Sequence, residues 1–186
     1  GCVFTETITL TEPILLNNIL STSNMSCNGI CDGTINTQTN GGTVPYSFLW
    51  NNSSTGNNLD SICAGNYTLT ITDNNGCLIT DSSIITEPSA IIISLDSSTN
   101  ITIYGGNDGA IHTTTYGGVN NFTHLWSGPA GFSASTLNIN NLLAGTYYLT
   151  TTDSTLCTAT DSFEVTQPPS LTANLDSVIN LGCNGI

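Results

Sequence analysis

Short runs of alternating hydrophobic and polar residues make up most of this chain, and turn-forming residues separate them. Alternation with a period of two is typical of strands that bury one face. Thr and Ile are frequent in the runs, and both favour strands over helices. Between Pro88 and Pro168 the pattern predicts six strands, at residues 90–95, 110–115, 123–127, 137–139 (the weakest), 146–152 and 158–166. The chain is therefore expected to be all-β, with antiparallel strands packed as two-layer sandwiches.

A self-comparison of the sequence finds this set of elements twice. The stretch Asp32–Ile35 recurs 76 residues later as Asp108–Ile111. Four residues are inserted after Trp126, so Ala64–Tyr67 recurs 80 residues later as Ala144–Tyr147. A fixed period of this kind indicates tandem domains.

Partial copies of the same unit lie at both ends of the chain. Residues 1–13 match the end of the first repeat, and Cys183–Ile186 has the same sequence as Cys27–Ile30. Proline marks strand ends, so the boundaries are placed at the Glu-Pro and Gln-Pro-Pro stretches. The expected parts are the end of a preceding repeat, two full domains and the start of a following repeat, at residues 1–13, 14–88, 89–168 and 169–186.

The composition excludes several classes of function. The chain has no Lys or Arg, 13 Asp and Glu, 2 His and a formal net charge of -13. Nucleic-acid binding needs a basic surface, and phosphate clamps or Schiff bases need Arg or Lys, so none of these is expected. No apolar run is long enough for a membrane span, and membrane insertion is not expected either. Seven Cys without metal-ligand spacing indicate disulfides in an oxidising, extracellular compartment.

Two aromatic positions favour an immunoglobulin-like sandwich. Trp50 and Trp126 lie in the third strand of their repeats, where such domains bury a tryptophan. Tyr67 and Tyr147 follow an Ala-Gly pair at the start of the next-to-last strand, the position of a tyrosine corner. The cysteine that antibody domains carry two residues after this tyrosine is a leucine in both repeats. We therefore expect tandem immunoglobulin-like (PKD-like) antiparallel β-sandwich domains with aliphatic packing in place of the core disulfide.

The first repeat also carries a family resemblance. Its motifs CNGxxDG, GGxxPYxFxW, CAGNYTLTITDNNGC and TEP lie at Cys27–Gly33, Gly41–Trp50, Cys63–Cys77 and Thr86–Pro88, and they resemble the SprB-type repeat of giant cell-surface gliding adhesins of Bacteroidota. The resemblance extends over essentially the whole chain, although the second repeat departs from it at several cysteine positions. It implies export by type IX secretion, a place in a cell-surface filament and a role in gliding motility, and it implies little about the ligand.

Comparison of the repeats predicts one disulfide. Cys31 and Cys63 are both absent from the second repeat, where Asn107 and Leu143 stand in their places. In an immunoglobulin-like topology both positions lie at the same end of the sandwich, so we expect a bond from Cys31 to Cys63.

A second pairing is predicted between the repeats. Cys27 lies at the same end of its domain as Cys31, whereas Cys77 and Cys157 follow turns at the opposite end, too far for a bond within one domain. Because the bottom of one domain would face the top of the next, Cys157 is the expected partner of Cys27. The remaining cysteines, Cys2, Cys77 and Cys183, would then reach repeats beyond this stretch.

No catalytic site is expected. We expect His124 to be packed in the third strand and His112 to be solvated, rather than either being a metal ligand or catalytic base. The turns Asp73–Gly76 and Gly106–Gly109 contain Asp and Asn side-chain oxygens that could be calcium ligands, but they lack the ligand spacing of a known calcium loop. We therefore expect no cofactor, with calcium as an open alternative.

The expected function is a non-catalytic structural and adhesive segment of a long extracellular repeat fibre that attaches to surfaces or to other cells. Its partners would be neighbouring repeats, other copies in a fibre and a surface or polysaccharide ligand, with no nucleic acid. One alternative is a carbohydrate-binding module, for which an exposed coplanar set from Tyr104, Tyr116, Phe132 and Tyr148 would argue. The other alternative is an accessory domain of a secreted enzyme.

Overall fold

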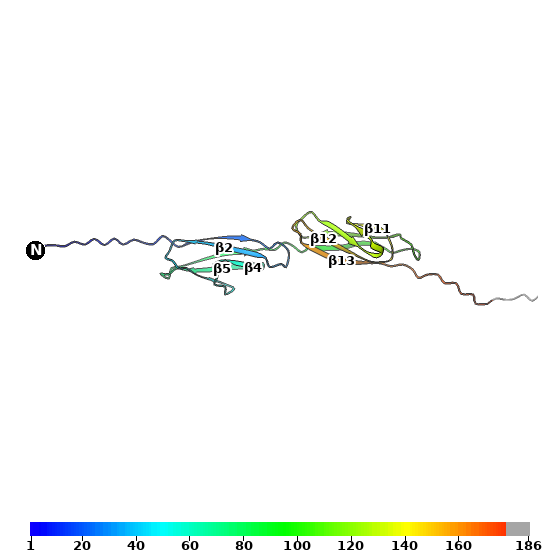
Figure 1. Ribbon diagram of the computed structural model, residues 1–186, viewed down its shortest axis with the longest axis horizontal. Coiled ribbons are helices and arrows are strands. Elements are labelled where there is room, and N and C mark those ends of the chain that lie inside the picture. The colour runs from blue at the N-terminus through cyan, green and yellow to red at the C-terminus, as the bar shows by residue number, and fades with distance from the viewer. Residues whose placement is uncertain (178–186) are drawn as a thin grey trace, which may run out of the picture. The chain divides into compact units, whose positions relative to one another are not determined.

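The computed structural model describes residues 1–177 and divides the chain into two compact units. Unit 1 comprises residues 1–90 with 117–120, and unit 2 comprises residues 91–116 with 121 onward. The chain is all-β, and its paired strands are antiparallel (Figure 1). Each unit is an immunoglobulin-like sandwich of two sheets with its own core. Among the described residues no helix is long or apolar enough to cross a membrane.

Unit 1 has two three-stranded sheets. Its strands are β1 (Asn17–Ser23), β2 (Gly33–Asn40), β3 (Ser47–Trp50), β4 (Leu59–Ile62), β5 (Gly65–Thr72) and β6 (Leu78–Ile85). One sheet has the order β1-β2-β4 and the other the order β3-β5-β6. From β2 to β5, strands that follow one another in the sequence thus lie in different sheets, as in an immunoglobulin-like domain.

Unit 2 repeats this arrangement with one addition. Its elements are β7 (Ile92–Thr99), β8 (Gly109–Tyr116), β9 (Thr123–Ser127), the 3-10 turn η1 (Pro129–Gly131), β10 (Ser133–Ala134), β11 (Ile139–Leu142), β12 (Gly145–Thr152) and β13 (Thr158–Val165). The sheets have the orders β11-β8-β7 and β10-β9-β12-β13. The six strands predicted in this repeat are all present.

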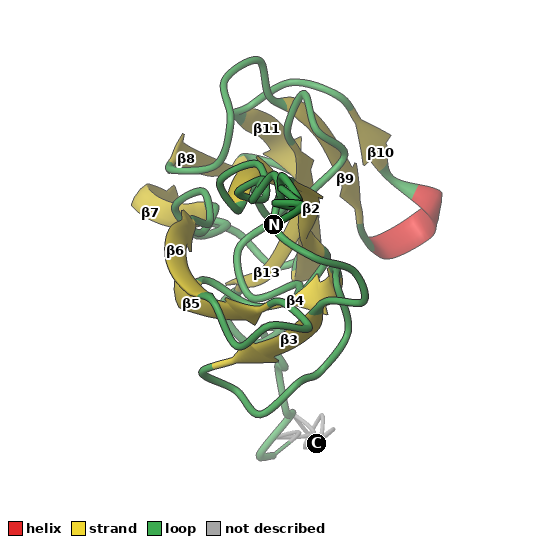
Figure 2. Cartoon of the chain, turned by 90° about the vertical axis from the view of Figure 1, so that its left-hand side faces the viewer, coloured by secondary structure: helices red, strands yellow, loops and turns green. Residues whose placement is uncertain are grey.

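The addition comes from the four residues inserted after Trp126, which the sequence pattern did not assign to any element. They form η1, red in Figure 2, and lead into β10, which pairs with the end of β9. Phe132 between them packs edge-on against the ring of Tyr147, with ring centroids 5.2 Å apart. The insertion therefore extends one sheet by a short edge strand and covers the corner tyrosine.

The weakest predicted strand, at 137–139, is displaced toward the C-terminus as β11. The side chain of Asn138 accepts a hydrogen bond from the Thr113 N–H at 2.9 Å, and the Leu137 carbonyl accepts one from the Thr113 hydroxyl at 2.9 Å. These side-chain bonds replace ladder bonds, so regular pairing begins only at Ile139. Unit 1 has the same arrangement, in which Asn58 accepts from the Thr37 N–H at 3.0 Å just before β4.

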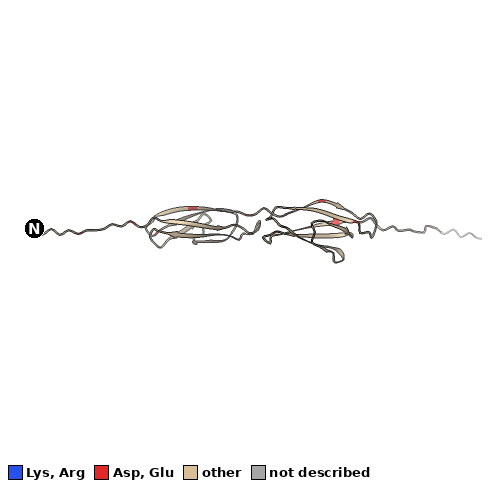
Figure 3. Cartoon of the chain, turned by 90° about the horizontal axis from the view of Figure 1, so that it is seen from above, with Lys and Arg blue, Asp and Glu red and all other residues tan. Residues whose placement is uncertain are grey.

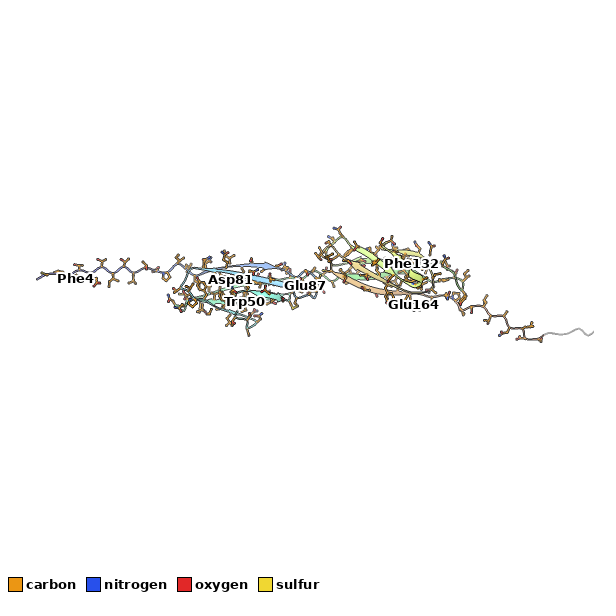
Figure 4. The ribbon with its side chains drawn as sticks, in the orientation of Figure 1. Phe4, Trp50, Asp81, Glu87, Phe132 and Glu164 are labelled. Atoms are coloured by element: carbon orange, nitrogen blue, oxygen red, sulfur yellow. A yellow bond between two sulfur atoms is a disulfide. The ribbon has the colours of Figure 1, made fainter. Side chains whose placement is uncertain are left out.

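The cores are built from the inward residues of facing sheets. Trp50 and Trp126 are almost completely buried, and Figure 4 labels Trp50. Each indole N–H donates to a loop carbonyl, Gly56 at 2.9 Å and Thr136 at 3.0 Å. The buried leucine of the neighbouring strand lies directly opposite in the register, Leu69 beside Trp50 and Leu149 beside Trp126. Aliphatic packing thus occupies the place of the core disulfide of antibody domains.

Residues 1–16 precede β1 and form no strand. Their apolar side chains are mostly exposed, including Phe4, which Figure 4 labels. Leu16 is the exception, because it is buried in the core of unit 1. These residues include the stretch 1–13 whose sequence matches the end of a repeat.

Candidate functional site

The two histidines lie apart, as expected from their strands. His112 is exposed on β8, and His124 is half-buried on β9 in the other sheet of unit 2. The ring of His124 is hydrogen-bonded through Nδ1 to the Thr151 hydroxyl at 3.2 Å, and desolvation lowers the pKa of His124. Within residues 1–177 no group of three or more His, Cys, Asp or Glu side chains is arranged to hold a metal ion.

The turn between the last two strands is organised by an aspartate in each unit. The carboxylate of Asp73 accepts backbone N–H bonds from Thr43, Asn75 and Cys77 at 2.8–2.9 Å. These hydrogen bonds hold the pKa of Asp73 below its ordinary value, and the bond from the Cys77 N–H has the largest effect. Asp73 is 5% exposed, and its carboxylate oxygens accept hydrogen bonds from the backbone, so its role in the structure is to organise the turn.

Asp153 has the same role in unit 2. Its Oδ1 accepts from the backbone N–H of Thr155 at 2.9 Å and of Cys157 at 3.0 Å. It also accepts from the Thr155 hydroxyl at 2.8 Å.

The opposite end of each unit carries a second repeated carboxylate. Asp32 accepts from both the hydroxyl and the N–H of Ser26, and Asp108 accepts from the same two groups of Thr102. In both cases the side-chain hydroxyl bond is the main reason that the pKa of the aspartate is lowered. These bonds close the loop between the first two strands. Asp108 is thus tied to the loop backbone, in the turn considered above for calcium.

A further clamp at this end joins that loop to the segment where the chain leaves the unit. In unit 1 the Gly29 N–H donates to Glu87 Oε2 at 2.8 Å, and in unit 2 the Gly105 N–H donates to Gln167 Oε1 at 2.9 Å. The sequence analysis used the Glu-Pro and Gln-Pro stretches only as boundaries and missed this role. Glu87-Pro88 recurs as Gln167-Pro168, with a side-chain carbonyl oxygen in the same place, and this recurrence was the signal that could have revealed it.

Cysteines occur at both ends of unit 1. Cys31 and Cys63 form a disulfide with a Cα–Cα distance of 4.1 Å, which is the pair predicted from their joint absence in unit 2. Cys27 and Cys157 are each disulfide-bonded as well. Cys2 and Cys77 have exposed free thiols. Cys183 lies outside the described residues.

Both predicted tyrosine corners are present. The Tyr67 hydroxyl donates to the Cys63 carbonyl at 2.9 Å, and the Tyr147 hydroxyl donates to the Leu143 carbonyl at 3.0 Å. Burial raises the pKa of Tyr147. In unit 1 the corner bond therefore reaches the residue that is also cross-linked to Cys31.

The aromatic residues considered for carbohydrate binding do not form one surface. Phe132 is packed against the core of unit 2 and is not an exposed platform. Tyr116 and Tyr148 are exposed, but they point outward from different sheets because their neighbours Thr115 and Leu149 face inward. Phe132, Tyr116 and Tyr148 therefore do not share a coplanar aromatic face of the kind that a carbohydrate-binding module would present, and the fourth residue, Tyr104, is exposed beside Ile103 in the loop between β7 and β8.

The surface carries charge of one sign only. Figure 3 colours Asp and Glu red and has no Lys or Arg to colour, in keeping with the formal charge of -13. Several of these carboxylates, such as Asp73 and Asp32, are engaged by backbone N–H groups as described above.

Each unit has a groove at one of its ends. In unit 1 a groove of about 180 Å³ is lined by Pro13–Leu16, Gly42, Asp73 and Cys77–Ile79, beside the turn that Asp73 organises. In unit 2 a groove of about 420 Å³ lies at the opposite end, and its lining residues are Thr102, Ile103, Tyr104, Pro168, Pro169 and Leu171.

Comparison with protein families supports the resemblance found in the sequence. Residues 19–55 match the family model of the SprB repeat, and this stretch contains most of β1 and all of β2 and β3. The resemblance to a SprB-type repeat is confirmed for this part of unit 1. Among curated proteins, none matches the chain.

Solved structures with similar chains include two whose descriptions name Ig domains. The crystal structure of Down Syndrome Cell Adhesion Molecule isoform 1.30.30 (N-terminal eight Ig domains) is 12% identical with a TM-score of 0.43, over 84% of this chain and 25% of that chain. The crystal structure of Dpr2 Ig1-Ig2 in complex with DIP-Theta Ig1-Ig3 is 13% identical with a TM-score of 0.31, over 82% of this chain and 66% of that chain. The present chain therefore spans only part of the length of each.

Proposed function

We propose that this chain is a non-catalytic segment of a long extracellular repeat fibre, which spaces the fibre and attaches it to surfaces or to other cells. Its partners are neighbouring repeats, other copies of the fibre and a surface or polysaccharide ligand. The SprB resemblance further suggests type IX secretion, a cell-surface filament and gliding motility as its context.

The observation that carries this proposal is that the chain enters and leaves each unit at opposite ends. In unit 1 β1 starts at Asn17, which pairs with Asn40 at the end of β2. The chain leaves at Ile85, whose side chain lies against Gly33 at the start of β2. Eight strand residues separate these two ends of β2, or about 25 Å.

Unit 2 has the same connectivity. Ile92 at the start of β7 pairs with Tyr116 at the end of β8, and Val165 at the end of β13 lies against Gly109 at the start of β8. A domain whose termini lie at opposite ends adds its full length to a tandem array, whereas adjacent termini would favour insertion into another domain. Such arrays gain reach through the number of repeats.

The proposal is tested on cells that produce the full protein. Antibody raised against this chain should label the surface of intact cells and should decorate filaments in electron micrographs. Cells that lack the gene should attach less to glass and to one another. Labelling confined to the cell interior, or unchanged attachment with the gene deleted, would contradict the proposal.

A further inference from the structure

Cys77 and Cys157 have the same position in their repeats, at the turn before the last strand. The Cys77 N–H donates to Asp73 Oδ1 at 2.8 Å, and the Cys157 N–H donates to Asp153 Oδ1 at 3.0 Å. Both cysteine carbonyls accept from the aspartate N–H at 3.0 Å. The two turns thus hold their cysteines alike, yet Cys157 is disulfide-bonded and Cys77 has a free, exposed thiol.

Cys77 borders the groove of unit 1 described above. The groove is mostly apolar, and its apolar lining comes from Pro13–Leu16 and from Leu78 and Ile79. Leu78 is 64% exposed, so part of this apolar lining is open to solvent. The one charged residue in the lining, Asp73, directs its carboxylate at backbone N–H groups. An occupant of this groove should be uncharged and should offer an apolar side chain.

The loop Cys27–Ile30 of the same repeat type has these properties. Its sequence, Cys-Asn-Gly-Ile, is uncharged and recurs at 183–186. The Ile30 N–H donates to the Cys27 carbonyl at 3.3 Å, and the Gly29 N–H donates to the Glu87 carboxylate at 2.8 Å. Cys27 is itself disulfide-bonded, and Ile30 is 53% exposed. The loop therefore presents a bond-forming cysteine next to an open isoleucine.

We propose that Cys77 and its groove form a docking site for the Cys-Asn-Gly-Ile loop of another copy of the repeat. The cysteine of that loop bonds to Cys77, and its isoleucine enters the groove. This inference rests on the proposed fibre and deepens it, because it makes the link from one repeat to another covalent.

Formation of the bond removes two electrons and two protons from two thiols, so an oxidant is required. A disulfide of a small molecule or of an oxidoreductase serves, first forming a mixed disulfide with the loop cysteine. The Cys77 thiolate then attacks the loop sulfur, the new S–S bond forms, and the departing thiolate takes the electron pair and a proton.

The test uses this chain and a synthetic peptide with the sequence of residues 24–30, Asn-Met-Ser-Cys-Asn-Gly-Ile. The peptide cysteine is activated as a mixed disulfide with thionitrobenzoate, whose release reports the reaction. Mass spectrometry after digestion locates the modified cysteine. Cys2 is the internal control, because it is equally a free, exposed thiol but lies in a segment without strands.

We expect Cys77 to react about ten-fold faster than Cys2, since partial burial of one isoleucine is worth roughly the free energy of such a factor. A peptide with serine in place of the isoleucine should lose this advantage. Leu78→Ser, a change at an exposed groove position, should slow Cys77 and leave Cys2 unaffected. Denaturant should make the two cysteines equal.

Equal rates at Cys77 and Cys2 in the folded chain would overturn the docking site, as would a rate at Cys77 that is independent of the isoleucine. Such a result would not bear on the proposed fibre, which the antibody labelling of intact cells tests separately. Conversely, if Cys77 reacts selectively but the protein is found only inside cells, the docking site stands and the proposed extracellular fibre is rejected.

Discussion

Asp73 illustrates how charged residues serve as structural parts at the scale of single residues. Three backbone N–H groups donate to its carboxylate, and the position recurs as Asp153 with the same kind of partners. The ionised form accepts these bonds best, which is why the pKa of Asp73 is lowered. The contribution of Asp73 to stability is therefore present at neutral pH and is lost as the pH falls through its lowered value.

His124 is the residue whose titration should matter nearest to neutral pH. Because desolvation lowers its pKa, the unfolded chain takes up a proton at a higher pH than the folded one does. The stability of unit 2 should therefore fall as the pH drops below about 6.5, the ordinary value for histidine. His124→Phe, which places the residue found at the equivalent Phe48, should reduce this loss.

The measurement is hydrogen exchange of unit 2 at pH 7.5 and pH 5.5, followed by mass spectrometry. His112→Phe is the matched control, because His112 is exposed on the other sheet. An equal pH dependence in His124→Phe and the unaltered chain would contradict the assignment.

At the scale of elements, period-two alternation and turn residues were enough to place the strands, because each strand of these sandwiches buries one face. The inserted turn η1 and strand β10 were not predicted. Their strand is two residues long, and its pairing with β9 depends on where the insertion folds back, which no local pattern encodes. The delayed start of β11 was missed for a related reason, since side-chain bonds from Asn138 and Thr113 replace the ladder there.

The strand ends also depend on small residues that the sequence pattern marks only as turns. A Cβ at Gly33 would lie 2.7 Å from Ile85 Cγ2 and 2.9 Å from the Ile62 carbonyl oxygen. Gly33→Ala should therefore push β2 away from β4 and β6 and destabilise unit 1 by about 1–3 kcal/mol. Gly65→Ala is the control, since its nearest neighbour would be Tyr67 at 3.8 Å. Urea unfolding of the two variants measures the difference, and equal midpoints would refute the steric argument.

The disulfide between Cys31 and Cys63 ties the loop before β2 to the corner before β5. It closes a loop with a sequence separation of 32 residues. Replacing both cysteines by serine should destabilise unit 1 by about 2–4 kcal/mol, mainly by freeing the unfolded chain. Unit 2 has Asn107 and Leu143 at these positions and should be unaffected. Hydrogen exchange resolved by unit tests this, and an equal loss of protection in both units would contradict it.

At the scale of the whole molecule, the lack of Lys and Arg has a direct chemical consequence. Trypsin cleaves after these residues, so it should leave the chain whole even after reduction in denaturant. A protease specific for Asp or Glu, of which the chain has 13, is the positive control and should fragment the same sample. Mass spectrometry of both digests is the measurement, and specific tryptic fragments would show that some other cleavage chemistry is at work.

The bond predicted from Cys27 to Cys157 also belongs to this scale, because it would join one repeat to the next. Both cysteines are disulfide-bonded, and Cys31 is already paired with Cys63. The two ends of a repeat are separated by the length of a strand, about 25 Å for eight residues, whereas a disulfide needs Cα atoms within about 7 Å. A bond from Cys27 to Cys77 within unit 1 is therefore excluded by distance, and Cys77 has a free thiol.

Because no Asp or Glu lies between Cys27 and Cys31, digestion of the unreduced chain with a protease specific for Asp and Glu should yield residues 13–32, 61–73 and 154–161 as one species of three cross-linked peptides. Cys157→Ser should release residues 154–161 from this species and expose one further thiol, and it should leave residues 13–32 joined to residues 61–73 through Cys31 and Cys63 as the internal control. A peptide that joins Cys27 to Cys183 would overturn the pairing, and the Cys77 docking site would then lose its parallel in Cys157. Recovery of the expected peptide would mean that bending between repeats is limited by a covalent bond, the property that a fibre under load requires.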